Sequence, residues 1–120
     1  MIAATASVLA GALASRPRRF EVVGASMSPA LGPGDRLVVV RARARPGDIA
    51  VLPDPRAPAR LVVKRVVAVE GGKVTVGGDN PAASTDSRVF GPVPATSVRG
   101  RAVYRYHPAA RRGRISRLVP

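Results

Sequence analysis

Short apolar runs, rich in valine, alternate with glycine, proline and aspartate along the chain after residue 20. Runs of this length, bounded by turn-forming residues, predict β-strands joined by tight turns. We expect strands at residues 20–23, 36–41, 48–52, 60–70, 73–76 and 98–106. The pattern requires no helix after residue 20. Five or six short strands with tight turns predict a compact all-β fold, either a small barrel or a sandwich.

The N-terminal end of the chain follows a different pattern. Residues 1–15 carry no charge and are mostly small and apolar, and Arg16, Arg18 and Arg19 come directly after them. As a helix this segment would extend about 22 Å, which is short of the ~30 Å hydrocarbon core of a membrane. It fits a membrane anchor, a helix on the membrane surface or a frayed end. If the segment spans, the arginines after it favour a cytoplasmic location for the rest of the chain.

The basic composition admits two interpretations. The 120 residues carry a net charge of +13, from 20 Lys and Arg against 7 Asp and Glu, which suits an anionic partner. A general bias toward arginine explains the same charge, because the arginines are scattered and only Tyr104 and Tyr106 offer stacking surfaces near them. Nucleic acid is therefore not an expected partner. The chain has no cysteine and one histidine, so disulfides are excluded, a zinc site is not favoured and no cofactor is expected.

Ser26 is the first candidate for chemistry. It stands in the segment 24–29, directly after the strand expected at residues 20–23. A serine on a tight loop at a strand end exposes its hydroxyl, and Gly24 lets a substrate carbonyl approach backbone N–H groups. Since serine is also a common turn residue, this feature alone is a weak indication of a nucleophile.

Lys64 is the second candidate, because it interrupts the most apolar of the expected strands. The chain has only two lysines, and a lysine can lose its proton when it is desolvated, whereas an arginine cannot. Burial among valines lowers the pKa of a lysine and makes its amine a general base for a nearby hydroxyl. Alternation equally permits Lys64 to lie with Val62 and Val66 on a solvent face, so both interpretations stay open for this residue alone.

A polar segment at residues 78–88 is the third candidate. Asp, Asn, Ser and Thr concentrate there between two expected strands. An ordinary loop has the same composition. Such a segment can also supply a hydroxyl that positions a lysine amine, and an Asp86–Arg88 pair that fixes the loop.

Four motifs occur in a definite order along the chain. They are V-x-G-x-S-M-x-P-x-L-x-x-G-D at 22–35, G-D at 47–48, V-K-R-V at 63–66 and G-D-N-P-x-x-S-x-D-S-R-x-F-G-P-V-P at 78–94. This order resembles the signal peptidase I family of serine endopeptidases over about residues 20–108. The resemblance implies a small signal-peptidase-like β fold. It divides the chain into an apolar N-terminal segment (1–19), a peptidase domain (20–108) and a solvated basic tail (109–120).

The resemblance also implies a role for each matching residue. Ser26 would be the nucleophile, and Lys64 would be the general base that later protonates the leaving amine. Ser84 would form a hydrogen bond with the Lys64 amine. The remaining residues would support the loop or line the site: Asp86 and Arg88 as a brace, Asp79 and Asn80 as shapers of the loop, and Met27 and Pro29 in the substrate groove. The Ser26 backbone N–H would hold the oxyanion, and Gly24 supplies no second donor.

The compact spacing after Lys64 points to one branch of the family. Lys64 and Gly78 are 14 positions apart, whereas larger signal peptidases insert a sizeable region between these motifs. The chain is most similar to the proteases that mature nickel-type superoxide dismutase, and more distantly to mitochondrial inner-membrane protease subunits. This branch implies a dismutase precursor as partner, whose short leader is removed to free nickel-binding residues. The protein would be membrane-associated, or cytoplasmic if residues 1–15 do not span.

Three alternatives remain open. A general type I signal peptidase would process secreted proteins and prefer small residues before the cut. A self-cleaving repressor-type peptidase shares a Ser/Lys dyad on a related β fold, but no helix-turn-helix domain precedes the catalytic motifs here. A basic nucleic-acid-binding β-barrel explains the charge but not the ordered motifs, and its binding would fall steeply with salt.

Overall fold

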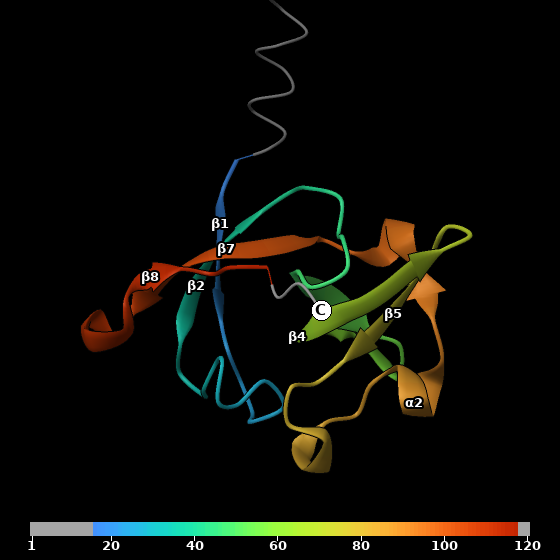
Figure 1. The fold of residues 1–120 in the computed structure, drawn as a ribbon, viewed down its shortest axis with the longest axis horizontal. Coiled ribbons are helices and arrows are strands. Elements are labelled where there is room, and N and C mark those ends of the chain that lie inside the picture. Colours follow the sequence, from blue (N-terminus) through green and yellow to red (C-terminus); the bar gives the residue numbers. More distant parts are fainter. Residues whose placement is uncertain (1–15, 118–120) are drawn as a thin grey trace, which may run out of the picture.

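The computed structural model describes residues 16–117, which form one antiparallel sheet of eight strands (Figure 1). The neighbouring order is β1-β2-β7-β3-β4-β5-β6, and β8 pairs with β7. The strands are β1 (Arg18–Glu21), β2 (Arg36–Val40), β3 (Ile49–Asp54), β4 (Ala57–Glu70), β5 (Lys73–Gly77), β6 (Val93–Pro94), β7 (Gly100–His107) and β8 (Gly113–Arg114). Figure 1 shows a curled sheet, with β1 and β2 on one side and β4 and β5 on the other. The all-β fold expected from the sequence is confirmed.

Short helices occupy the connections between strands. They are the 3₁₀ helices η1 (Pro81–Ala83), η2 (Ala95–Ser97) and η3 (Ala109–Arg111), and the single α-helical turn α2 (Ser87–Phe90). The hydrophobic pattern, which required no helix after residue 20, missed α2 because four residues are too few for a helical period. Its start is fixed by Asp86, whose carboxylate accepts a hydrogen bond from the Arg88 backbone N–H.

Two clusters of buried apolar side chains form the core. The first includes Met27, Leu31, Leu37 and Val63, and the second includes Val66, Val74 and Val76. β3 contributes to both clusters because successive side chains on a strand point to opposite faces: Ile49 and Val51 pack in the first, and Ala50 and Leu52 in the second. A strand buried on both faces explains the uninterrupted apolar run at this position, and it places β3 and its neighbour β4 at the centre of the molecule.

The C-terminal segment packs on the sheet, where the sequence predicted a solvated tail. β8 pairs with β7, and Ile115 packs against the first core cluster. Arg111 lies 3.6 Å from the buried carboxylate of Asp35, and Arg105 of β7 donates to the same carboxylate at 3.1 Å. Composition did not predict this packing, because it depends on only two features: the apolar side chain of Ile115 and the distant carboxylate of Asp35.

The apolar residues 1–15, expected as an anchor or a surface helix, lie outside the described part of the chain. Between residues 16 and 117, no helix combines the length and the apolar character needed to cross a bilayer. The described chain begins at the edge of the sheet, where β1 pairs with β2 and Arg19 lies over the ring of Tyr106, 5.9 Å from its centroid.

Candidate active site

Ser26 and Lys64 line the same cavity, which has a volume of about 170 Å³. Its walls come from three segments that are far apart in the sequence: the loop after β1, the strands β3 and β4, and the loop before α2. The fold therefore brings together the serine and the lysine that the sequence singled out. No hydrogen bond joins their side chains within residues 16–117.

The backbone around Ser26 is held by the polar loop at residues 78–80. The backbone N–H of Asn80 donates to the Ser26 carbonyl at 2.8 Å, and the Asn80 side chain donates to the Ala25 carbonyl at 3.2 Å. Gly24 has a φ of +88°, which side chains rarely allow, and an added Cβ there would meet open space. The chain thus turns at Gly24, and Asn80 fixes the next two residues at the wall of the cavity.

Lys64 lies in the middle of β4, opposite Ala50 of β3. Its side chain is buried, with 5% of the residue exposed, so the solvent-face interpretation is wrong. Val66, on the same face of the strand, is 1% exposed, which shows that this face points inward. Burial lowers the pKa of the Lys64 amine, and the carboxylate of Asp86 opposes part of this effect.

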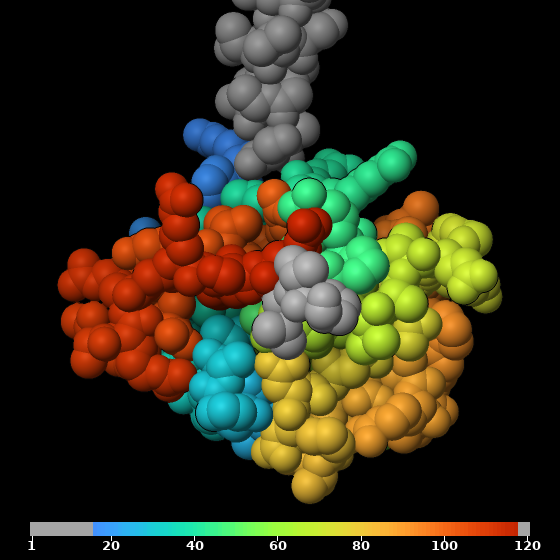
Figure 2. Space-filling model, viewed as in Figure 1, coloured from blue at the N-terminus to red at the C-terminus, as the bar shows by residue number. Residues whose placement is uncertain are grey.

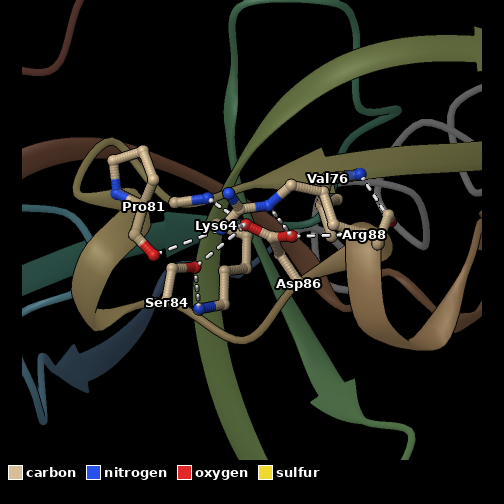
Figure 3. A network of polar contacts seen from close by, with 8 residues as sticks. Lys64, Val76, Pro81, Ser84, Asp86 and Arg88 are labelled. Atoms are coloured by element: carbon tan, nitrogen blue, oxygen red, sulfur yellow. Dashed lines mark hydrogen bonds and ion pairs between the residues drawn. The ribbon is translucent and has the colours of Figure 1, made fainter.

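A chain of hydrogen bonds runs from Lys64 into the loop before α2 (Figure 3). The Lys64 Nζ donates to Ser84 Oγ at 3.0 Å, and Ser84 Oγ donates to Asp86 Oδ2 at 3.1 Å. Figure 3 shows the Lys64 nitrogen pointing at Ser84, with Asp86 between Ser84 and Arg88. The contact between Lys64 and Ser84 that the resemblance implied is therefore present in the structure.

Asp86 is the centre of this network. Besides Ser84, it accepts hydrogen bonds from the Gly78 backbone N–H at 3.1 Å and from the Arg88 backbone N–H at 3.0 Å and Nε at 2.9 Å. Burial by itself raises the pKa of the Asp86 carboxyl, but the hydrogen bonds from Arg88, Gly78 and Ser84 together hold it well below its usual range. Arg88 also reaches the Pro81 carbonyl at 3.2 Å, so the Asp86–Arg88 pair ties both ends of the loop together.

Arg65 is a supporting residue whose role sequence reasoning left without an account. It donates to both carboxylate oxygens of Asp79, with Nε at 3.2 Å and Nη2 at 2.7 Å, and to the Gly47 carbonyl at 3.0 Å. Two parallel hydrogen bonds to one carboxylate give the pair a defined orientation. The sequence feature that could have revealed this role is the charge of Arg65. It lies on the face of β4 opposite Lys64, and a charged side chain in so central a strand requires an acidic partner.

Gly78 allows the closest approach in the site. A Cβ at this position would overlap the Ser84 side chain and lie 2.7 Å from the Ser26 carbonyl oxygen. Only a residue without a side chain lets the 78–80 loop pass between the Ser26 loop and Ser84. The glycine of the G-D-N motif therefore has a packing reason in this fold.

Met27 and Pro29, expected in the substrate groove, do not line the cavity. Met27 is fully buried in the first core cluster. Pro29 is exposed, and its carbonyl accepts a hydrogen bond from Arg111. These two side chains thus lie outside the cavity of Ser26 and Lys64, and their contribution to a substrate groove stays a prediction.

The cavity instead has walls that the sequence did not single out. Val62, Asp54, Arg56 and Arg60 line it together with Thr85. Asp54 is buried and accepts a hydrogen bond from the Arg56 backbone N–H at 2.9 Å, which lowers the pKa of its carboxyl. These charged residues lie in or next to the proline-rich segment 53–59, between the strands expected at residues 48–52 and 60–70, where no motif indicates a site.

The described residues contain no cluster of three or more His, Cys, Asp or Glu side chains that could hold a metal ion. The cavity contains the Ser26 hydroxyl and the buried Lys64 amine, and hydrogen bonds through Ser84 connect this amine to the Asp86 carboxylate.

Comparison with known proteins places this arrangement in a family. A family model described as signal peptidase, peptidase S26, matches residues 1–79 and 69–107. Mitochondrial ATP-independent inner membrane protease subunit 1a of Arabidopsis thaliana is 36% identical over 84 residues, which cover 52% of this chain and 50% of the relative. Mitochondrial inner membrane protease subunit 2 of Danio rerio is 32% identical over 126 residues, covering 82% of this chain and 69% of the relative.

The chain thus spans about half the length of the Arabidopsis relative. The family model, in contrast, matches nearly all of the region that carries the four motifs and the network around Lys64. Together these findings show that the chain belongs to the signal peptidase family, peptidase S26, whose members are serine-type peptidases.

Proposed function

We propose that the chain is a serine endopeptidase in which Ser26 is the nucleophile and Lys64 is the general base. The observation that carries this proposal is the buried amine of Lys64, which lines the same cavity as Ser26. Since burial lowers its pKa, Lys64 loses its proton at a lower pH than a free lysine, and its amine can then accept the proton of a hydroxyl. Membership in the signal peptidase family supports the same assignment.

The direction of the hydrogen bonds supports a free lone pair on Lys64. The Ser84 hydroxyl has one proton, and the ionised Asp86 carboxylate can only accept, so this proton is directed to Asp86. The Ser84 oxygen then accepts from Lys64 and does not donate to it. The lone pair of the neutral amine is therefore not used by Ser84 and is available to Ser26.

The proposed reaction has two halves. Lys64 removes the proton from Ser26 Oγ as this oxygen attacks the scissile carbonyl carbon, and the oxyanion lies against the Ser26 backbone N–H. The C–N bond then breaks, the Lys64 ammonium protonates the leaving amine, and the acyl group remains as an ester on Ser26. In the second half, neutral Lys64 deprotonates a water that attacks the ester. As the new carboxylic acid leaves, the Lys64 ammonium returns this proton to Ser26 Oγ.

Five further residues act as positioning residues in this proposal. Ser84, Asp86 and Arg88 hold the Lys64 amine, and Asp79 and Asn80 connect the loop to β4 and to the backbone of Ser26. Arg65 joins them through its double hydrogen bond to Asp79. These contacts link the nucleophile and the base through a single loop.

The proposed substrate is a precursor protein that loses an N-terminal leader, most specifically the precursor of a nickel superoxide dismutase. The short connection between Lys64 and Gly78, here the β4–β5 hairpin, supports this branch. A cavity of about 170 Å³ accommodates small side chains, so we expect small residues next to the cut. Because two relatives are named as inner membrane protease subunits, membrane association is part of the proposal, with a cytoplasmic location as the alternative.

The test is an incubation of the purified chain with a nickel superoxide dismutase precursor and with a secretory preprotein, followed by mass analysis of the new N-termini. Ser26→Ala and Lys64→Arg are expected to lower the rate at least about a thousandfold. Ser28→Ala and Lys73→Arg are the matched controls, since they change the same residue types outside the cavity, and both are expected to cut at the normal rate.

The outcome separates the candidate functions. Cutting of the dismutase precursor alone supports the specific branch, and cutting of the secretory preprotein moves the protein to the general signal peptidases. An active Lys64→Arg chain would overturn the general base, because a guanidinium cannot accept the proton. Cleavage of the chain itself at a single site would favour the repressor-type alternative. Salt-sensitive nucleic-acid binding that survives Ser26→Ala, without cutting, would favour the basic barrel.

A further inference from the structure

A second cavity, larger than that of Ser26 and Lys64, lies apart from the proposed active site. It has a volume of about 450 Å³ and shares no lining residue with the cavity of Ser26 and Lys64. The two are nevertheless neighbours, because Leu61 of β4 lines the large cavity and the next residue, Val62, lines the small one. In Figure 2 the start of the described chain (blue) and the segment after β2 (green) lie at the same edge of the molecule, and both contribute to the large cavity.

Five arginines converge on this cavity, which we call the arginine cavity: Arg16, Arg18, Arg19, Arg41 and Arg99. No acidic side chain lines it, and all seven acidic residues of the chain lie between residues 21 and 86. Six of these seven form ion pairs with arginines elsewhere in the molecule: Glu21, Asp35, Asp48, Asp54, Asp79 and Asp86. Ten arginines of the described chain have no ion pair, and a general bias toward arginine does not explain why five of these ten surround one hollow.

The charge of the arginine cavity is thus not neutralised by the described protein. Like charges that converge on a concave surface repel one another and raise the local potential, and a bound anion relieves both effects. Guanidinium groups bind phosphate through paired, charge-assisted hydrogen bonds. The cavity therefore favours a phosphate-bearing ligand.

The uncharged walls of the cavity favour a ligand that also has an apolar part. They come from Phe20, Val39, Val51 and Leu61, and Leu61 is 42% exposed. Thr96 is the single neutral polar side chain among the lining residues that the structure describes. A sugar or a nucleoside would leave most of its hydroxyl and amide groups without partners on such walls, whereas hydrocarbon next to a phosphate would cover them.

We propose that the arginine cavity binds the headgroup of an anionic membrane phospholipid, with the phosphate among the arginines and the first methylenes over Leu61 and Phe20. The sequence supports a lipid over other phosphates, because the uncharged, mostly apolar residues 1–15 lead directly into Arg16. Arginines next to an apolar segment are attracted to the negative surface of a membrane. The proposal does not depend on the chemistry assigned to Ser26.

The test measures the partition of the full chain, carrying Ser26→Ala, between buffer and vesicles. One set of vesicles contains phosphatidylglycerol in phosphatidylcholine, and the other contains phosphatidylcholine alone. The triple variant Arg18→Gln/Arg41→Gln/Arg99→Gln is expected to weaken binding to the phosphatidylglycerol vesicles at least about tenfold, since each arginine near the surface contributes to the attraction. The matched control, Arg112→Gln/Arg114→Gln/Arg117→Gln, removes the same charge from exposed positions outside the cavity and is expected to stay within about threefold.

Equal losses in the two triple variants would overturn the proposal, because general electrostatic attraction would then explain the binding. Equal binding to both kinds of vesicle would overturn it as well.

Competition with inorganic phosphate at millimolar concentration is a further experiment. Full displacement of the chain from vesicles at matched ionic strength would assign the site to free phosphate instead. Leu61→Gln keeps all five arginines, and a weaker partition in this variant is expected only if the apolar wall contacts the lipid. Thermal melts check that each variant is folded. Because the vesicle experiment uses no substrate, its failure says nothing about the proposed cleavage activity.

Discussion

The proposed mechanism requires a neutral Lys64 amine within a protein of net charge +13, and the surroundings of Lys64 shift its pKa in both directions. Burial lowers the pKa of the amine most strongly, and the positive charges of Arg60 and Arg56 lower it further. The carboxylates of Asp86 and Asp54 raise it. An ionised Asp86 so near the amine is tolerable because Arg88 neutralises it at 2.9 Å. The ion pair thus orients the base through Ser84 without restoring its full basicity.

Titration of Lys64 is a direct test at this scale. With only two lysines in the chain, ¹³C-labelled lysine gives two side-chain resonances, and Lys64→Met identifies which one is lost. We expect the Lys64 signal to titrate below the ordinary value of 10.5, and kcat/KM to rise with pH and level off at the same pKa, because the neutral form is the active one. Lys73 is the internal control. A rate profile that is flat across the Lys64 titration would contradict the role of this amine.

At the scale of the element, the loop between β5 and α2 holds the site together. It passes the Ser26 loop at Gly78 and Asn80, reaches Lys64 through Ser84, and closes on itself through Asp86. None of the loop residues in these contacts belongs to a strand, so the loop depends on its polar side chains to keep one conformation. Its stability should therefore depend on the ionisation of Asp86.

Asp86→Asn tests this dependence. The pKa of Asp86 is lowered in the folded state, so its contribution to stability is complete above the unfolded value of about 3.8 and is lost as the pH falls below it. We expect the variant to unfold with about 2 kcal/mol less free energy at pH 7, because charge-assisted hydrogen bonds to the buried Asp86 carboxylate are lost. The difference from the parent chain should shrink steadily from about pH 5 downward. Denaturant melts at several pH values measure it, and a difference that does not change with pH would contradict the assignment.

Sequence patterns predicted the elements that are long enough to show a period. β2, β3, β4, β5 and β7 lie close to their expected positions because their alternation or apolar run spans five residues or more. The two-residue strands β6 and β8 could not be predicted in this way, since they exist only where a neighbouring strand is present to pair with. For the same reason, the sequence did not predict that the C-terminal segment pairs with β7.

The candidate site could be predicted where its residues lie within the sequence motifs. The motifs identified Ser26, Lys64 and Ser84, which the structure groups around one cavity and its hydrogen-bond network. The resemblance also implied a groove position for Met27, whose side chain is buried in the first core cluster, and sequence motifs alone do not separate a core residue from a lining residue. The walls formed by Asp54 and Arg60 depend on how β4 continues through a proline-rich segment, which no local rule predicts.

Across the whole molecule, buried aspartates fix the turns of an otherwise arginine-rich chain. Asp35, Asp48, Asp54 and Asp86 are all buried, and each accepts a hydrogen bond from a backbone N–H two or three residues away and pairs with an arginine. A buried carboxylate with both kinds of partner is satisfied, whereas one without them would be costly. The few acids of the sequence are thus concentrated at structural positions.

Asp35→Asn is the prediction at this scale. Asp35 accepts from the Gly32 backbone N–H at 2.9 Å and pairs with Arg105 and Arg111, so it connects the Ser26 segment to the C-terminal segment. We expect a loss of about 3 kcal/mol in the free energy of unfolding, because a largely buried Arg105 is left without its counter-charge. Glu21→Gln breaks an exposed pair with Arg36 and should change stability by less than about 1 kcal/mol. Similar losses in both variants would show that burial does not decide the effect.

The turn of the β4–β5 hairpin has a practical consequence for engineering. Gly71 and Gly72 are exposed there, while Glu70 and Lys73 remain paired on either side of the turn. Strand ends that are held together by their own ladder do not need the covalent link between them. A reporter domain could be fused into this turn, or the gene could be divided there into two separately expressed fragments. Since one fragment would carry Ser26 and Lys64 and the other Ser84 and Asp86, recovered protease activity would report the reassembly of the halves.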